Sequence, residues 1–143
     1  MTDNRAKALE VLQEMLPEML GTDNDRVQTS GFAAELGELS LDHVFGGLWA
    51  RPGLDRRSRS LVTLGILIAQ RATEEIKVHF PIALRNGITR DELEEVVYHA
   101  AGYAGYPAAS TARLAGQEVL DFDEAAARDP LRHMKATGEN NPG

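Results

Sequence analysis

Hydrophobic side chains recur at helical spacing along most of this chain. Residues 5–20 carry apolar side chains every three or four positions, which predicts a helix, and Gly21 provides a C-terminal stop. Residues 27–48 show a looser helical pattern. The candidate breaks within it are Gly31, Gly37 and Ser40. We therefore expect a helical N-terminal region in more than one piece.

A turn and a strongly apolar segment follow. Residues 51–54 are typical of a turn, and Asp55 is a suitable N-cap for a helix that extends to about Arg71. Residues 61–69 make that helix apolar on every face. A buried strand would also fit this run, but arginines flank it and the chain offers no other strand. Because a helix that is apolar all round must be surrounded by protein, we expect another subunit to cover part of it.

The next helix carries a proline inside it. Thr73 is a suitable cap, and Asn86–Gly87 is a suitable terminator. Pro81 removes one backbone donor and is expected to bend the helix between Lys77 and Pro81.

A capping box and a second proline mark the last two helices. Thr89–Glu92 has the pattern of a capping box that opens one helix. Residues 102–107 interrupt it, and Pro107 starts a final helix that extends to about Ala126.

The predicted fold class is all-α, with about six helices. They form a single domain over residues 1–127, followed by a polar tail over residues 128–143 that is expected to fray. The apolar content of 43% over 143 residues is enough for one hydrophobic core.

Charge and cysteine content narrow the possible functions. The chain has no cysteine, which excludes thiol chemistry by its own side chains. Its 22 acidic and 15 basic residues give a net charge of −7, which disfavours nucleic-acid binding. A small anionic substrate remains compatible, because a local arginine cluster can reverse the field in one pocket. The first residues lack the apolar region of a signal peptide, and residues 61–69 are too short to cross a bilayer, so we expect a cytoplasmic protein that binds no membrane.

Glu75 and His79 form the first candidate for chemistry. They are four positions apart on a predicted helix, so the carboxylate can hold the imidazole and raise its pKa, which suits a general acid or base. The alternative is an exposed ion pair of little consequence. Apolar Ile82 and Ala83 share this helix face and favour a half-buried site.

Arginines and aromatic residues form the second candidate group. Among the four arginines near the predicted turn, Arg56 and Arg57 fit a solvated helix start, whereas Arg51 and Arg59 are candidates for binding a carboxylate. The candidate pocket walls are Trp49, Tyr103 and Tyr106, with core packing or a subunit contact as the alternative. The remaining histidines, His43, His99 and His133, fit an interface or the tail. No spacing motif predicts a metal site or a phosphate-binding loop.

Three segments resemble the carboxymuconolactone decarboxylase family. They are residues 45–61, with Trp49, Arg51 and Arg59, residues 75–89, with Glu75 and His79, and residues 98–109. The resemblance covers residues 32–120 in the same order and spacing. It implies an all-α fold like that of alkyl hydroperoxidase D, and a homo-oligomer, namely a hexamer built as a trimer of dimers. Pro81 departs from the family pattern.

The alkyl hydroperoxidase D branch of this family uses a pair of cysteines and an upstream glutamate. The matching positions here are Ala72, Glu75 and Ser60, so the resemblance favours the cysteine-free decarboxylase branch and no thiol peroxidase activity is expected.

The resemblance implies decarboxylation of 4-carboxymuconolactone to the 3-oxoadipate enol-lactone in protocatechuate catabolism, without a cofactor. In this interpretation His79 delivers a proton and Glu75 orients the His79 imidazole. Arg51 and Arg59 bind the carboxylate of the substrate or stabilise the charge that develops in the reaction. Trp49 and Tyr103 wall the pocket. The alternatives are an enzyme of the same fold acting on another small lactone or acid, and a non-catalytic oligomeric module.

Overall fold

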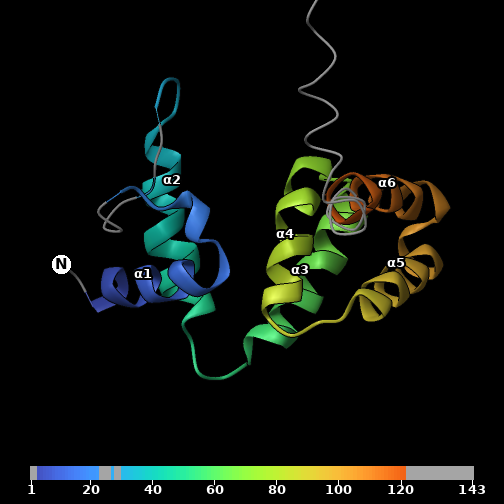
Figure 1. The fold of residues 1–143 in the computed structure, drawn as a ribbon, viewed down its shortest axis with the longest axis horizontal. Coiled ribbons are helices and arrows are strands. Elements are labelled where there is room, and N and C mark those ends of the chain that lie inside the picture. Colours follow the sequence, from blue (N-terminus) through green and yellow to red (C-terminus); the bar gives the residue numbers. More distant parts are fainter. Residues whose placement is uncertain (1–2, 23–26, 28–29, 122–143) are drawn as a thin grey trace, which may run out of the picture. The chain divides into compact units, whose positions relative to one another are not determined.

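The computed structural model describes residues 3–22, 27 and 30–121, and Figure 1 shows that helices make up most of this part of the chain. The α-helices are α1 (Asp3–Met15), α2 (Glu35–Ser40), α3 (Arg56–Gln70), α4 (Thr73–Arg85), α5 (Arg90–Ala104) and α6 (Tyr106–Gly116). Three shorter helical segments are the 3-10 turn η1 (Pro17–Met19) and the π-helical η2 (Leu41–Trp49) and η3 (Gln117–Asp121). The described residues contain one isolated β-bridge, Leu20 to Val27, and no strand. The all-α prediction is therefore confirmed.

The helices group into two compact units. The first comprises Met1–Thr63 and Ile82–Arg90, and the second comprises Leu64–Pro81 and Asp91–Gly143. The boundaries between the units fall within α3 and α4, so each of these helices continues from one unit into the other. The predicted tail, 128–143, and His133 lie outside the described residues.

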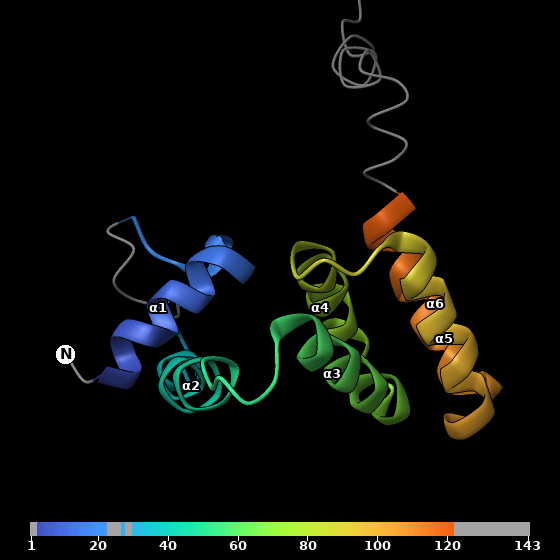
Figure 2. The ribbon, with the colours of Figure 1, turned by 90° about the horizontal axis from the view of Figure 1, so that it is seen from below.

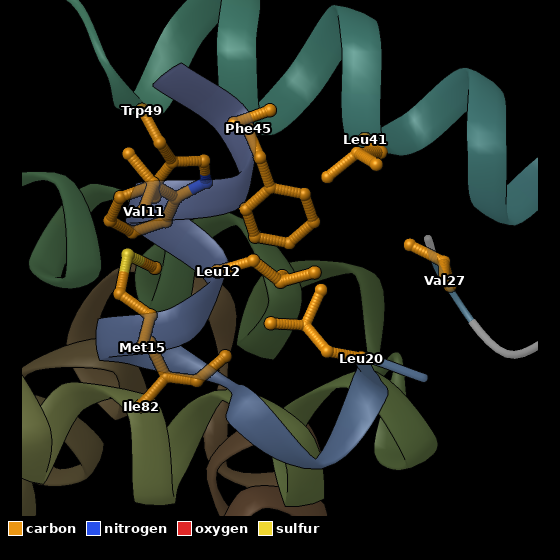
Figure 3. Close-up of a cluster of buried hydrophobic side chains, with 10 residues drawn as sticks. Val11, Leu12, Met15, Leu20, Val27, Leu41, Phe45, Trp49 and Ile82 are labelled. Atoms are coloured by element: carbon orange, nitrogen blue, oxygen red, sulfur yellow. The ribbon is translucent and has the colours of Figure 1, made fainter. Parts of the chain in front are cut away.

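The core of the first unit lies between α1, η2 and the second half of α4. Leu12 and Met15 of α1, Phe45 of η2 and Ile82 of α4 lie within one hydrophobic cluster (Figure 3). Gly46 permits this packing, because a Cβ at that position would lie 2.4 Å from the carbonyl oxygen of Asn4.

Ion pairs surround the cluster of the first unit. Arg5 of α1 pairs with Glu38 of α2 and, at 3.0 Å, with Asp42 of η2. Arg85 pairs with Glu18 and donates a hydrogen bond of 2.8 Å to the carbonyl oxygen of Met15. These contacts connect α1 and the segment after it to residues distant in the sequence.

Two predicted boundaries in this region are wrong. The helix expected over residues 5–20 ends at Met15, because Pro17 excludes its predecessor from the helical conformation; Leu16 has φ −151° and ψ 61°. Conversely, Gly37 and Ser40 do not break the following helix, which runs without interruption from α2 into η2. Only Gly31 of the candidate breaks lies outside a helix, with φ +86°.

The start and end of α3 agree with the sequence. Asp55 accepts a 2.7 Å hydrogen bond from the backbone N–H of Ser58, which is the N-cap that was predicted. Arg71, just after α3, has φ +54°, a left-handed conformation that stops the helix. The apolar run is helical, as predicted: Leu64 and Ile68 are buried within the chain, whereas Val62 and Ile66 are more than half exposed. The expected cover by another subunit stays a prediction.

In the second unit, the first half of α4 packs against α6 and η3. The ring of Phe80 lies so close to Gly116 that a Cβ there would be 3.0 Å from it. Lys77 pairs with Glu118 of η3 at 2.8 Å and with Glu74 at 3.2 Å. These contacts hold the part of α4 that carries His79.

The helices after α4 begin close to where the sequence places them. Gly87 has φ +92° after the end of α4, and α5 starts at Arg90, directly after Thr89 of the predicted capping box. The predicted interruption is shorter than 102–107, because α5 continues to Ala104 and only Gly105, with φ +95°, separates it from α6 (Figure 2). The described helical segments end at Asp121, and the expected end near Ala126 lies outside the described residues.

Candidate active site

Glu75 and His79 lie one turn apart on α4, as their spacing predicts. Their closest atoms, Nε2 of His79 and Oε2 of Glu75, are 4.0 Å apart. The two side chains differ in exposure, because the imidazole is 14% exposed and the carboxylate is 63% exposed. The pair therefore joins a largely buried base to a carboxylate that remains in water.

The surroundings of His79 decide its protonation. Its Nδ1 atom is fully buried, and its neighbours on the same helix face, Ile76, Ile82 and Ala83, are all buried. Burial lowers the pKa of His79 below its ordinary value, and the attraction of Glu75 offsets this only in part. The sequence predicted a raised pKa from the Glu75 charge; the net direction is opposite, because loss of hydration outweighs an exposed carboxylate.

Pro81 does not interrupt the helix that carries His79. Helix α4 runs through it from Thr73 to Arg85. Because proline has no N–H, the carbonyl of Lys77 receives no helical hydrogen bond from position 81. The bend expected from this remains a prediction.

The two candidate arginines have different environments. Arg59 donates two hydrogen bonds to the preceding turn, from Nε to the carbonyl oxygen of Leu54 at 3.0 Å and from Nη2 to that of Arg51 at 3.1 Å. Arg51 is exposed, and within the described part of the chain no hydrogen bond or ion pair is formed by its side chain. Arg56, interpreted as a solvated helix start, pairs with Glu14 of α1. The structure thus brings Arg51 and Arg59 together through backbone contacts.

The aromatic candidates lie in opposite environments. Trp49 is 7% exposed and belongs to the hydrophobic cluster of the first unit, so its indole packs in a core, which is the alternative that the sequence left open. Its role as a pocket wall stays a prediction. Tyr103 and Tyr106 are 88% and 79% exposed. The ring of Tyr103 lies 5.2 Å from that of His99, which is also exposed. Tyr103 can therefore wall a pocket only where another surface covers it.

One polar pair with a buried member was not predicted from the sequence. Ser60 of α3 is 1% exposed, and its Oγ accepts a 2.9 Å hydrogen bond from Nδ2 of Asn86. Asn86 was singled out as a helix terminator, and Ser60 as the counterpart of a glutamate in the redox branch. A polar residue directly before an apolar run was the available signal. The pair connects α3 with the end of α4 inside the first unit.

Two negative findings concern the described residues. Nowhere in 3–22, 27 and 30–121 do three or more histidine, aspartate or glutamate side chains gather in a way that could hold a metal ion. None of the helices within these ranges is both long and apolar enough to span a membrane.

The site residues are divided between the two compact units. Glu75 and His79 belong to the second unit, and Tyr103 does too. Trp49, Arg51 and Arg59 belong to the first. The largely buried imidazole of His79 in the second unit and the exposed guanidinium of Arg51 in the first are both suited to chemistry on an anion.

The sequence profile of the carboxymuconolactone decarboxylase family matches residues 34–118, which contain all of these side chains. The chain belongs to this family. The absence of cysteine from the whole sequence places it outside the part of the family that uses a redox-active cysteine pair.

Two of the three relatives described below are named as decarboxylases. A nitrosuccinic acid decarboxylase of Metarhizium robertsii is 43% identical over 84 residues, which cover 59% of this chain and 59% of the relative. A 4-carboxymuconolactone decarboxylase of Acinetobacter baylyi is 42% identical over 77 residues, 54% of this chain and 58% of the relative. An uncharacterized 15.0 kDa protein of Paracoccus denitrificans is 32% identical over 81 residues, 55% of this chain and 60% of the relative. The chain thus spans about three-fifths of the length of each.

Proposed function

We propose that this protein decarboxylates a small carboxylic acid whose product anion is stabilised by conjugation. Our first candidate reaction converts 4-carboxymuconolactone to the 3-oxoadipate enol-lactone, in the protocatechuate branch of aromatic catabolism. The observation that carries the proposal is the largely buried His79 imidazole, 4.0 Å from a carboxylate, on a helix of this decarboxylase family. A cytoplasmic location is part of the same proposal.

The decarboxylation needs an electron acceptor for the bond pair that is released, and a donor of one proton. When the carbon–carboxylate bond of 4-carboxymuconolactone breaks, its electron pair moves through the adjacent C=C bond onto the lactone carbonyl oxygen. CO2 leaves and a dienolate remains. One proton then adds to the carbon next to the carbonyl and gives the product. The substrate supplies the electron sink, so the protein has to bind the acid, stabilise the developing charge and deliver the proton.

We assign proton delivery to His79. Because burial lowers the pKa of His79, its imidazolium gives up a proton readily. The buried setting also keeps water from protonating the intermediate in its place. A bound anionic substrate would raise that pKa and so favour the protonated form in the complex. Glu75 orients the imidazole from the solvent side, because it is mostly exposed.

We assign substrate binding to Arg51. Its side chain is exposed and forms no hydrogen bond or ion pair with the described residues, so it is available to a carboxylate. Planar, two-pronged binding of a carboxylate is the strongest interaction open to arginine here. The acetate arm of 4-carboxymuconolactone is the group that we expect it to hold.

A second candidate substrate follows from the Metarhizium relative, which is named for nitrosuccinic acid. Loss of the carboxylate next to a nitro group leaves a nitronate, in which the nitro oxygens take the electron pair. The protein would again supply a carboxylate anchor and a proton. The two candidates therefore share one reaction class and differ in the acceptor group.

We further propose that the protein is a homo-oligomer, and specifically a hexamer. Large apolar side chains that this chain leaves exposed support an assembly: the most exposed among the described residues are Phe32, Leu36, Val62, Tyr98, Tyr103, Tyr106 and Leu114. Light scattering coupled to size-exclusion chromatography tests this, and a monomer at micromolar concentration would contradict it.

The test of the proposed function is CO2 release from both acids by the purified protein. We expect turnover of 4-carboxymuconolactone, and a smaller or absent rate with nitrosuccinate. The reverse order would transfer the function to the second candidate. Release from neither, with a folded protein, would leave two alternatives, an enzyme acting on another small lactone or acid and a non-catalytic oligomeric module.

A further inference from the structure

The turn between η2 and α3 is closed by backbone hydrogen bonds at its start. Within the first unit, the N–H of Ala50 donates to the carbonyl oxygen of Phe45 and the N–H of Arg51 to that of Leu48, both at 3.1 Å. At its end, Asp55 caps α3 through Ser58. Between these two hydrogen-bonded ends of the turn, the carbonyl oxygens of Arg51 and Leu54 accept hydrogen bonds from one side chain.

That side chain is Arg59, on the first turn of α3. Its Nε donates to Leu54 and its Nη2 to Arg51, at 3.0 and 3.1 Å, so one edge of the guanidinium joins the two ends of the turn. A guanidinium presents these donors in a rigid fork, which an ammonium group cannot reproduce. The fork therefore fixes the backbone of the residue whose side chain is open to solvent, Arg51.

The neighbouring arginine behaves differently. Arg56 pairs with Glu14 on α1, and its described polar contact does not include the turn. Arg59 is thus distinguished from it by its partners rather than by its charge. Arginine would not be required at position 59 for helix formation, since a cation in the first turn opposes the helix dipole.

We propose that Arg59 is a positioning residue, which holds the 51–54 turn so that Arg51 meets the carboxylate of the substrate. This inference rests on the proposed function for the role of Arg51. It replaces the direct catalytic or binding role that the sequence predicted for Arg59. Arg59 acts through the backbone of Arg51, and Arg51 alone contacts the anion.

A double-mutant cycle separates these two roles. We would compare wild type, Arg51→Gln, Arg59→Gln and the double variant, with Arg56→Gln as a control that removes the same charge. We expect each single variant of 51 and 59 to lose about tenfold or more in kcat/KM, mainly through KM. Because Arg59 acts through Arg51, the double variant should be no worse than Arg51→Gln alone. Losses that multiply would show that Arg59 binds substrate itself, which overturns the proposal.

Hydrogen exchange supplies a readout that does not depend on activity. In Arg59→Gln, the hydrogen-bonded backbone amides of Ala50 and Arg51 should exchange faster, while Arg51→Gln and Arg56→Gln leave them unchanged. Unchanged exchange in Arg59→Gln overturns the proposal at any level of activity. If wild type releases no CO2 from either acid, the proposed function fails, and the exchange of these amides still decides whether Arg59 holds the turn.

Discussion

The Glu75–His79 pair on α4 and the Arg51–Arg59 pair at the turn look alike in sequence, since each has two polar groups a few positions apart. In the structure they work differently. On α4 the spacing alone brings the partners together, and burial then separates them into a largely buried imidazole and an exposed carboxylate. At the turn, Arg59 donates hydrogen bonds to two backbone carbonyls, whereas the side chain of Arg51 is exposed to solvent. In the proposed function, one member of each pair acts on the substrate and the other supports it.

The largest effect on activity is expected from a substitution of His79 on α4. Replacing His79 by Gln keeps a polar side chain but removes the proton donor, and general acid catalysis contributes about 10² to 10⁴ in rate. We expect kcat to fall by that factor with little change in thermal stability. His43→Gln, at an exposed position of η2, is the matched control and should retain full activity. Undiminished turnover by a folded His79→Gln protein would show that His79 is not the proton donor.

The packing beneath the turn can be tested independently of activity. Gly46→Ala would place a Cβ 2.4 Å from the carbonyl oxygen of Asn4, so α1 must shift on η2. We expect a loss of about 1–3 kcal/mol in the free energy of unfolding, measured by urea denaturation.

Gly65→Ala provides the contrast for this substitution. A Cβ on Gly65 meets nothing within 4 Å, and the residue lies inside α3. Alanine should therefore stabilise the protein by roughly 0.5–1 kcal/mol. Equal effects at positions 46 and 65 would show that the approach of α1 to η2 does not constrain the first unit.

The pH dependence of activity tests the role proposed for His79 on α4. Burial lowers the pKa of His79 in the free protein, so kcat/KM should fall as the pH rises through a value below about 6.5, the ordinary value for histidine. The bound anion favours the imidazolium, so the corresponding fall in kcat should occur at a higher pH. The two profiles are measured over the same buffers. Coincident falls would indicate that the substrate charge does not act on His79.

The smallest effect is expected from Glu75. Its carboxylate is mostly exposed and 4.0 Å from the imidazole, and exposed pairs of this kind contribute only about 0.2–1 kcal/mol. Glu75→Gln should therefore change kcat by less than about fivefold. It should also lower the pKa of His79 a little further, which an NMR titration of the imidazole would detect. A loss as large as that of His79→Gln would mean that Glu75 takes part directly.

Features set by local sequence were predictable. Asp55 as a helix cap, the helical state of residues 61–69 and the proximity of Glu75 to His79 depend on neighbours within one or two turns. The family was recognisable for the same reason, because its motifs are contiguous strings. The exact end of the first helix was missed, although Pro17 gave the signal.

Features set by tertiary packing were not predictable in the same way. The burial of Trp49 depends on α1 crossing η2 at Gly46, and the partners of Arg59 are carbonyls five and eight residues before it in an irregular turn. The direction of the pKa shift of His79 depends on how much water its surroundings exclude. Spacing identified the candidate residues, and the fold showed their burial and their partners; their roles stay predictions.

The site of protonation tests the central claim most directly. If His79 delivers the proton, decarboxylation of 4-carboxymuconolactone in D2O should place deuterium on one face of the carbon beside the lactone carbonyl, as NMR of the product would show. With His79→Gln, we predict much slower CO2 release and deuterium on both faces. A variant that released CO2 at the wild-type rate, with the same single-face labelling, would contradict the account.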